Sequence, residues 1–465
     1  MNLRAYQTKS IDLVRQEYAS GKKKTCLVLP TGAGKSVIAL AMMVAAFARG
    51  KKVVFVVRGV SLIDQISRRL FSEGLEHGVL QSSHWNFRPT HPVQIVSVDT
   101  AIARNIFPPA DFLVIDECDQ CTSEGYKKFI AQYPKAFILG ITATPYSSKS
   151  LRHVADSVVV PITMTELIAQ GYLVPFKYYA PSSPDLSDVK TSASTKDYVN
   201  SSLEAAMVSG SLTGNIIDHY RRLASDRPTL LFAVNIHHSK YLVDKFISAG
   251  IPAEHADANT PQEQRDEIFS RLKSGETKVV SNVGIATRGF DAPFISCLIL
   301  ARPTKSLNLH IQMLGRGTRP SDGKTSNLIL DHAGNLLRHG LPTDDREISL
   351  DGKDKNTVKK YKTCKQCFCV YIGSPCPECG AVSPVQDRES MELAESEEQL
   401  KEIIEFGNPV ERIYKNLLQE AKRRGYKSQW AGHKLVERVG LEAAKSVLPA
   451  SFLTYSFSKY QGVSK

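Results

Sequence analysis

The chain lacks the features that mark membrane and secreted proteins. None of its apolar runs approaches the roughly 18 residues that a helix needs to cross a bilayer, and the longest, such as residues 53–57, have the length of a buried strand. The opening segment MNLRAYQTKS has no apolar stretch of the kind that signal peptides carry. We therefore expect no membrane partner and a cytoplasmic location.

Acidic residues are in short supply relative to basic ones. The 465 residues include 59 Lys and Arg against 47 Asp and Glu, which gives a net charge of +12. A surplus of this size fits a polyanionic partner such as nucleic acid. The remaining composition, 42% hydrophobic and 23% charged, is that of a globular protein and excludes a collagen-like, coiled-coil or wholly disordered chain.

Short apolar runs rich in β-branched residues occur in two series, and helical patterns separate them. Runs of this kind are typical of strands that are buried on both faces of a parallel sheet. The first series is TCLVLP, KKVVFVV, VQIVSV, DFLVID and AFILGIT, and the second is TLLFAV, TKVVSNV, ISCLILA and SNLILD. We predict an α/β protein with a first domain at 1–150, a connector with the opening helices of the next domain at 151–224, and a second domain at 225–340.

A candidate phosphate-binding loop, LPTGAGKS, spans residues 29–36 between a predicted strand and a predicted helix. Leu29 stands where the strict phosphate-loop motif has its first glycine. The backbone N–H groups of Thr31, Gly32, Ala33 and Gly34 are expected to surround phosphate groups, with help from the helix N-terminus. The motif also assigns Lys35 to the β- and γ-phosphates and Ser36 to Mg²⁺.

A second polar group follows another buried strand, at DECD (116–119). Both groups lie at the carboxyl ends of strands, where α/β sheets bind ligands. Asp116 is placed to hold the water shell of the Mg²⁺ ion. Glu117 beside it is placed to orient or deprotonate an attacking water molecule.

Six short motifs occur in the order found in superfamily 2 helicases, and the resemblance covers about residues 1–335. Within that superfamily the chain is most similar to RadD-type and phage branch-migration helicases. The resemblance implies two RecA-like domains, ATP and Mg²⁺ as cofactors, and DNA as partner. The motifs are LRAYQ (3–7), LPTGAGKS (29–36), DECD (116–119), TATP (142–145), TRGFD (287–291) and QMLGRGTR (312–319).

The resemblance also assigns roles to individual nucleotide-site residues. Gln7 would read the edge of the adenine, with Arg4 or Tyr6 against its ring. Arg316 and Arg319 would face the γ-phosphate across the cleft between the domains, one of them as an arginine finger. The further assignments are Gln312 near the attacking water, and Gly289 and Asp291 as sensors of nucleotide and ribose.

The family pattern places one strand of nucleic acid along loops of both domains. Backbone amides, hydroxyls and a few cations suit contact with phosphates and sugars without reading of the bases. The residues on this expected path are Arg58, Gly59, Asp99, Thr100, Asn235, Asn282 and Thr287.

Nine cysteines are present, and five of them fall within residues 364–379. Cys364 and Cys367 form one C-x-x-C pair, and Cys376 and Cys379 form a second pair eight residues later. This spacing predicts a structural Zn²⁺ site in a small ribbon at 361–385, a module for contact with DNA or with a protein partner. Cys369 is an alternative ligand, and reduced thiols without a metal are the other interpretation.

The remaining sequence, residues 405–465, is predicted to form a basic helical region. Taken together, these features favour an ATP-dependent DNA helicase or translocase that unwinds or branch-migrates forked and junction DNA. Two alternatives stay open at this point. One is an RNA helicase, because the motor motifs do not distinguish the sugar, and the other is a nucleotide-switched ATPase that binds nucleic acid without unwinding it.

Overall fold

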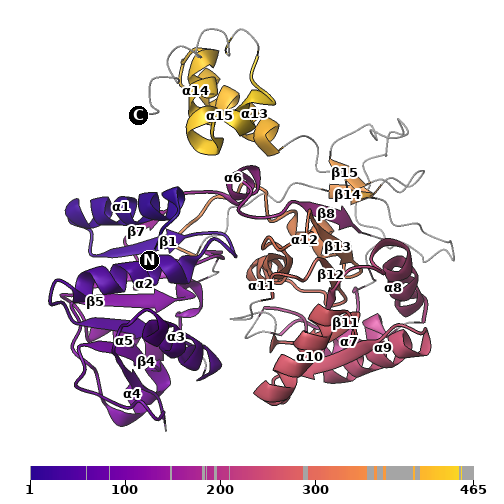
Figure 1. Cartoon of the computed structure of the whole chain (residues 1–465), viewed down its shortest axis with the longest axis horizontal. Coiled ribbons are helices and arrows are strands. Elements are labelled where there is room, and N and C mark those ends of the chain that lie inside the picture. The colour runs from indigo at the N-terminus through magenta and orange to yellow at the C-terminus, as the bar shows by residue number, and fades with distance from the viewer. Residues whose placement is uncertain are drawn as a thin grey trace.

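The computed structural model contains two α/β domains and a small helical module (Figure 1). The structure describes residues 2–58, 60–82, 84–146, 149–180, 184, 186–192, 196–208, 210–285, 292–352, 361–363, 370–372, 402–403, 409–449 and 452. Among these residues no helix combines the length and the apolarity that crossing a membrane requires.

The first domain is built on a seven-stranded sheet in which every pairing is parallel. Its strands are almost wholly buried, as the continuous apolar runs predicted. In spatial order they are β3 (Gly78–Leu80), β4 (Val93–Val96), β2 (Val53–Val56), β5 (Phe112–Asp116), β6 (Phe137–Thr142), β1 (Lys24–Val28) and β7 (Ser157–Val159). The helices of this domain are α1 (Ala5–Ala19), α2 (Lys35–Phe47), α3 (Val60–Ser72), α4 (Val98–Arg104) and α5 (Glu124–Ala131), with a 3₁₀ turn η1 (Cys118–Gln120) after β5.

The second domain repeats this plan with another seven-stranded sheet. Six of its strands pair in parallel, and the short β16 at one edge is antiparallel to β8. The spatial order is β10 (Ala253–Asp257), β11 (Val279–Val283), β9 (Thr229–Phe232), β12 (Cys297–Leu300), β13 (Asn327–Asp331), β8 (Phe176–Tyr179) and β16 (Glu402–Ile403). The helices are α7 (Asn200–Met207), α8 (Gly210–Leu223), α9 (Ile236–Ser248), α10 (Gln262–Ser274), α11 (Leu307–Leu314) and α12 (Asn335–His339), with a 3₁₀ turn η3 (Gly315–Gly317) after α11.

These two parallel-sheet domains confirm the predicted fold class in outline, and α9 and α10 separate strands of the second series, as its helical patterns indicated. The connector is more than a linker, however. It gives β7 to the first sheet and β8 to the second, and α6 (Met164–Ala169) lies between these strands. The expected opening helices of the second domain correspond to α7 and α8.

The third part of the chain is the C-terminal helical module, α13 (Pro409–Arg423), α14 (Ser428–Val439) and α15 (Leu441–Lys445). These helices share a core of their own, which includes Leu417, Leu435 and Phe452. A short antiparallel pair, β14 (Tyr361–Thr363) and β15 (Val370–Ile372), precedes the module. The four predicted zinc ligands, Cys364, Cys367, Cys376 and Cys379, lie outside the described residues.

Gly432 of α14 permits a close approach to Phe452, and we predict that Gly432→Ala destabilises the module. Alanine normally stabilises a helix relative to glycine by about 1 kcal/mol. Here a Cβ would lie 2.4 Å from Cε2 of the Phe452 ring, and such overpacking costs roughly 1–3 kcal/mol. We expect faster hydrogen exchange of the α13 and α14 amides. In a Phe452→Ala background the same substitution is expected to slow the exchange, and faster exchange there would contradict the explanation.

Candidate active site

The phosphate-loop candidate lies between β1 and α2 and depends on two glycines with left-handed backbone. Gly32 has φ +87° and Gly34 has φ +78°, a region that is costly for residues with a Cβ. A Cβ on Gly34 would lie 2.6 Å from Nε2 of Gln7, and one on Gly32 would lie 2.9 Å from Cδ2 of Leu173. The loop is therefore held between α1 on one side and the connector on the other.

The residues expected at the adenine lie together beside this loop. Oε1 of Gln7 accepts a hydrogen bond of 3.0 Å from the Arg4 backbone N–H, and the Tyr6 hydroxyl donates to the Ala33 carbonyl at 2.8 Å. The Arg4 guanidinium lies 4.6 Å from the centre of the Tyr172 ring. Tyr172 comes from the connector, and nothing in its local sequence indicated a place at this site.

The two acids after β5 lie in an unusual backbone setting. Glu117 has φ +46° and ψ +49°, which is uncommon for a residue other than glycine, and such strain tends to occur at functional sites. Its backbone N–H donates to Oδ1 of Asp116 at 3.0 Å. Its buried Oε2 has no hydrogen-bond partner within the described part of the chain, so one acceptor is directed into the site.

Burial and neighbouring charges govern the ionisation of the Asp116 and Lys35 side chains. Burial, with the neighbouring Glu117 carboxylate, raises the pKa of Asp116 to about 7. Burial also lowers the pKa of Lys35, against the opposing effect of Glu117 and Asp116. An added divalent cation would favour the ionised carboxylates. The donor set of Ser36 and Asp116 therefore fits Mg²⁺, and the glycine loop with Lys35 fits a nucleoside triphosphate.

The segment QMLGRGTR of the second domain lies against the phosphate loop. A Cβ on Gly315 would lie 2.5 Å from the Cβ of Thr31, and one on Gly32 would lie 3.4 Å from Oγ1 of Thr318. Burial lowers the pKa of Arg316 to about 10, although Glu117 acts to raise it. Burial also lowers the pKa of Arg319. A Cβ on Gly32 would lie 3.5 Å from Cγ of Arg319, so this side chain lies at the interface with the first domain. The roles expected of Arg316 and Arg319 at the γ-phosphate stay predictions.

Asp119 joins the two domains through a buried hydrogen-bond network. Oδ1 accepts from the Thr142 hydroxyl at 2.6 Å, and Oδ2 accepts from Nδ2 of Asn308 in the second domain at 3.0 Å. Gln312 Nε2 lies 3.5 Å from the Thr144 hydroxyl, a second and longer link between the domains. Burial, with the Glu117 charge, raises the pKa of Asp119 to about 7. Asn308 was missed from the sequence because its partner is 189 positions away.

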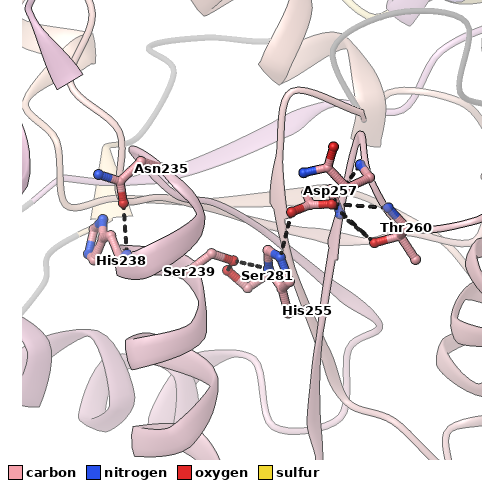
Figure 2. Close-up of polar contacts among 8 residues, drawn as sticks. Asn235, His238, Ser239, His255, Asp257, Thr260 and Ser281 are labelled. Atoms are coloured by element: carbon pink, nitrogen blue, oxygen red, sulfur yellow. Dashed lines mark hydrogen bonds and ion pairs between the residues drawn. The ribbon is translucent and has the colours of Figure 1, made fainter. Parts of the chain in front are cut away.

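The expected nucleic-acid residues are spread over both domains. In the first domain, Arg58 and Asp99 are exposed, and the Thr100 hydroxyl accepts from the Ser82 backbone at 3.3 Å. In the second, Asn235 caps α9 by accepting from the His238 backbone N–H at 2.8 Å (Figure 2). The last described member, Asn282, is 1% exposed and donates to the Leu231 carbonyl at 2.8 Å.

Asn282, in β11, therefore has a structural partner in the neighbouring strand β9, and its side chain does not lie on the surface. The other residues of the predicted sites, Gly59, Thr287, Gly289 and Asp291, lie outside the described residues.

A polar network beside Asn235 ties α9 to strands β10 and β11 (Figure 2). The Ser239 hydroxyl is 2.7 Å from Nδ1 of His255 and 2.6 Å from the Ser281 hydroxyl, and Nε2 of His255 is 3.3 Å from Oδ2 of Asp257. The order Ser, His, Asp is that of a nucleophile with its base. Ser239 is fully buried, however, so the network fixes the position of these elements and offers no nucleophile to a substrate.

Comparison with known families assigns the two halves of this site separately. Residues 1–147 match the family described as "Type III restriction enzyme, res subunit". Residues 213–321 match the "Helicase conserved C-terminal domain". The first range includes the phosphate loop and the acids after β5, and the second includes the arginines of the opposite face.

Individual proteins agree with these matches. A 51.5 kDa protein of a Lactococcus phage (isolate 7-9) is 30% identical over 77% of this chain and 75% of its own length. A Saccharomyces cerevisiae protein named provisionally as the ATP-dependent helicase IRC3 is 29% identical over 71% of this chain. The matched region covers about half of the yeast protein.

Among solved structures, the DNA-bound Type ISP restriction-modification enzyme LlaBIII aligns with a TM-score of 0.54 at 18% identity, over 74% of this chain and 28% of that one. This likeness shows a shared fold of two RecA-like domains. Together with the family matches and the arrangement of the nucleotide site, it leads to one conclusion: the chain belongs to the superfamily 2 helicases and is an ATP-dependent enzyme of that family.

Proposed function

We propose that the protein is a DNA helicase or translocase that unwinds or branch-migrates forked and junction DNA. One observation carries the motor part of this proposal: the phosphate loop and the arginine segment belong to different domains and meet at Thr31 and Gly315. Nucleotide that binds between them is contacted by both domains. Its binding and hydrolysis therefore change the relative position of the domains, which is what moves a nucleic-acid strand held by both.

The nucleotide roles follow from this arrangement. The backbone of residues 31–34 binds the phosphates, with Lys35 at the β- and γ-phosphates, and Ser36 and Asp116 hold Mg²⁺. Glu117 orients or deprotonates the attacking water with its unpartnered Oε2. Bound ATP supplies the phosphoryl group whose hydrolysis drives the cycle. Arg316 and Arg319 stabilise the negative charge that develops during transfer.

The remaining nucleotide contacts come from Arg4 and Gln7 at the base, Gln312 near the water, and Gly289 and Asp291 at the ribose. The path of one DNA strand runs over Arg58, Gly59, Asp99, Thr100, Asn235, Asn282 and Thr287. Because Asn282 is buried, its part in this path is to hold the β11 backbone in place through Leu231.

DNA is favoured over RNA as the substrate. The net charge of +12 supports a polyanionic partner of either kind, while the solved relative LlaBIII is described as bound to DNA. The preference for forks and junctions comes from the resemblance to RadD-type and phage branch-migration helicases. We place the motor domains at 1–150 and 225–340, joined by the connector at 151–224, with the zinc ribbon at 361–385 and the basic helical region at 405–465.

For the ribbon, we propose one structural Zn²⁺ held by Cys364, Cys367, Cys376 and Cys379. The support is the spacing of two C-x-x-C pairs, which is typical of tetrahedral zinc sites. So short a segment cannot build an apolar core of its own, so a metal would stabilise it. The ribbon would then present a fixed surface to DNA or to a protein partner.

We predict that Lys35→Ala and Arg319→Ala each lower the DNA-stimulated ATPase rate by at least about a hundredfold, because each removes a cation that faces the transferred phosphoryl group. The measurement is the steady-state ATPase rate of each variant. It is made with no nucleic acid, single-stranded DNA, forked DNA, a four-way junction and RNA of matched length. Stimulation is expected to be greatest with fork or junction DNA. Stimulation by RNA alone would support the RNA helicase, and a rate indifferent to every nucleic acid would support the nucleotide-switched ATPase.

A second prediction concerns the contact between Asn308 and Asp119. Asn308→Asp places two carboxylates about 3 Å apart in a buried interface, where like charges repel strongly. We expect kcat to fall about tenfold or more, since the closed cleft becomes harder to form. Asn308→Ala removes the hydrogen bond without adding charge and is expected to lower kcat only a few-fold. Equal effects of the two variants would show that charge repulsion at this contact does not limit turnover.

The zinc proposal predicts one Zn²⁺ per chain in the purified protein, measured by elemental analysis. Cys364→Ser with Cys376→Ser should remove it, because each substitution takes one thiolate from a different pair. Cys369→Ser is the matched control and should retain the metal. Zinc loss in the control alone would instead make Cys369 a ligand.

A further inference from the structure

The connector segment from Thr163 to Val174 lies between the nucleotide site and the C-terminal module, and it contacts both. Its helix α6 begins with a capping box. Oε2 of Glu166 accepts from the Thr163 backbone N–H at 2.7 Å, and the Thr163 hydroxyl accepts from the Glu166 N–H at 3.2 Å. At the other end, the Tyr172 backbone N–H donates to the Leu167 carbonyl at 2.9 Å. Tyr172 is therefore attached directly to the body of α6.

At the nucleotide end, three successive residues of this segment reach the site. The ring of Tyr172 lies 5.2 Å from that of Tyr6, and the Arg4 guanidinium lies over it. Leu173 lies against the phosphate loop at Gly32. The Val174 backbone N–H donates to the carbonyl of Thr318, in the arginine segment, at 2.8 Å.

At the module end, α6 packs against α13 and α14, and Ala169 lies against the core of the module. The Gln170 side chain donates to the Arg438 carbonyl. Nε of Arg438 lies 3.5 Å from Oε1 of Glu166. That carboxylate therefore caps α6 with one oxygen and pairs with the module through the other.

The chemistry of the Arg4 and Tyr172 pair matches a nucleobase. Arg4 is exposed and Tyr172 is half-buried, and the guanidinium lies over the phenol ring beside Gln7. Guanidinium and aromatic faces are the surfaces on which bases stack. The amide of Gln7 lies at the same place: Oε1 accepts from the Arg4 N–H and Nε2 donates to the Ala33 carbonyl, and each atom has the capacity for one further hydrogen bond.

From these contacts we propose that Tyr172 is a nucleobase-binding residue of the ATP site, and that docking of the C-terminal module on α6 sets its position. The proposal rests on the ATP site described above and goes beyond it, because it makes nucleotide affinity depend on the module. Any partner that moves the module off α6 would then weaken ATP binding through Tyr172, with no direct contact between that partner and the nucleotide.

The test of the base contact compares two ligands on the full-length protein. ATP and inorganic tripolyphosphate each compete with a fluorescent ATP analogue, and the tripolyphosphate has no base to stack. Tyr172→Ala should raise the Kd of ATP about tenfold and leave that of tripolyphosphate unchanged, and Tyr172→Phe should restore ATP binding. An equal loss for both ligands would overturn the proposal, because it would mean that Tyr172 only supports the phosphate loop.

The test of the coupling uses substitutions outside the nucleotide site. Ala169→Arg forces a long side chain between α6 and the module, and Arg438→Ala removes the ion pair. We expect the Kd of ATP to rise about fivefold in the first variant and about twofold in the second, since exposed ion pairs contribute little. Lys422→Ala, on the exposed end of α13, is the control and should leave the Kd unchanged.

Combining Ala169→Arg with Tyr172→Ala distinguishes coupling through Tyr172 from two independent effects on ATP binding. If the module acts through Tyr172, the double variant binds ATP no more weakly than Tyr172→Ala alone. Independent, multiplying effects would overturn the coupling. Failure of the proposed function would look different: the wild-type protein would bind neither ATP nor tripolyphosphate, and Lys35→Ala would change nothing.

Discussion

Gly315 and Thr31 lie so close that a single added carbon atom on the glycine would sit 2.5 Å from the threonine Cβ. This contact joins a 3₁₀ turn of the second domain to the phosphate loop of the first. The two domains therefore meet at backbone distance, and the Arg319 side chain lies beside Gly32 of the phosphate loop. Each domain supplies one part of the nucleotide site, and in the proposed cycle chemistry and movement depend on the same surface.

The charges within this surface indicate which groups a bound nucleotide would compensate. Lys35 and Arg316 lie with Asp116 and Glu117 in a setting that lowers the pKa of the two cations and raises that of Asp116. Burying charges costs free energy unless each is compensated. In the proposed cycle, a triphosphate with its metal would add negative charge beside the cations and positive charge beside the carboxylates, and hydrolysis and release would remove this compensation.

The sequence was sufficient for most strands that are buried on both faces and for contiguous motifs, although the short buried strand β3 is not among the predicted runs. Strands such as β2 and β12 are continuous apolar runs, so their existence follows from the pattern alone. The edge strand β10 reads AEHAD and is half polar, because one side of it faces no further strand of the sheet within the described residues. Contacts between Asp119 and Asn308, or between Arg4 and Tyr172, join residues 189 and 168 positions apart, and no local pattern encodes them.

The connector links the two domains directly, because the strands at its two ends belong to different sheets. β7 pairs with β1 in the first domain and β8 pairs with β13 in the second, so any rotation between the domains must be absorbed by the residues in between. Pro161 and Pro175 restrict the backbone near either strand, and α6 is fixed by its capping box. Gly171, with φ +73° and open space around its Cα, is the position with the most conformational freedom. It immediately precedes Tyr172, whose backbone N–H donates to the Leu167 carbonyl, so the turn that this glycine permits keeps the tyrosine attached to α6.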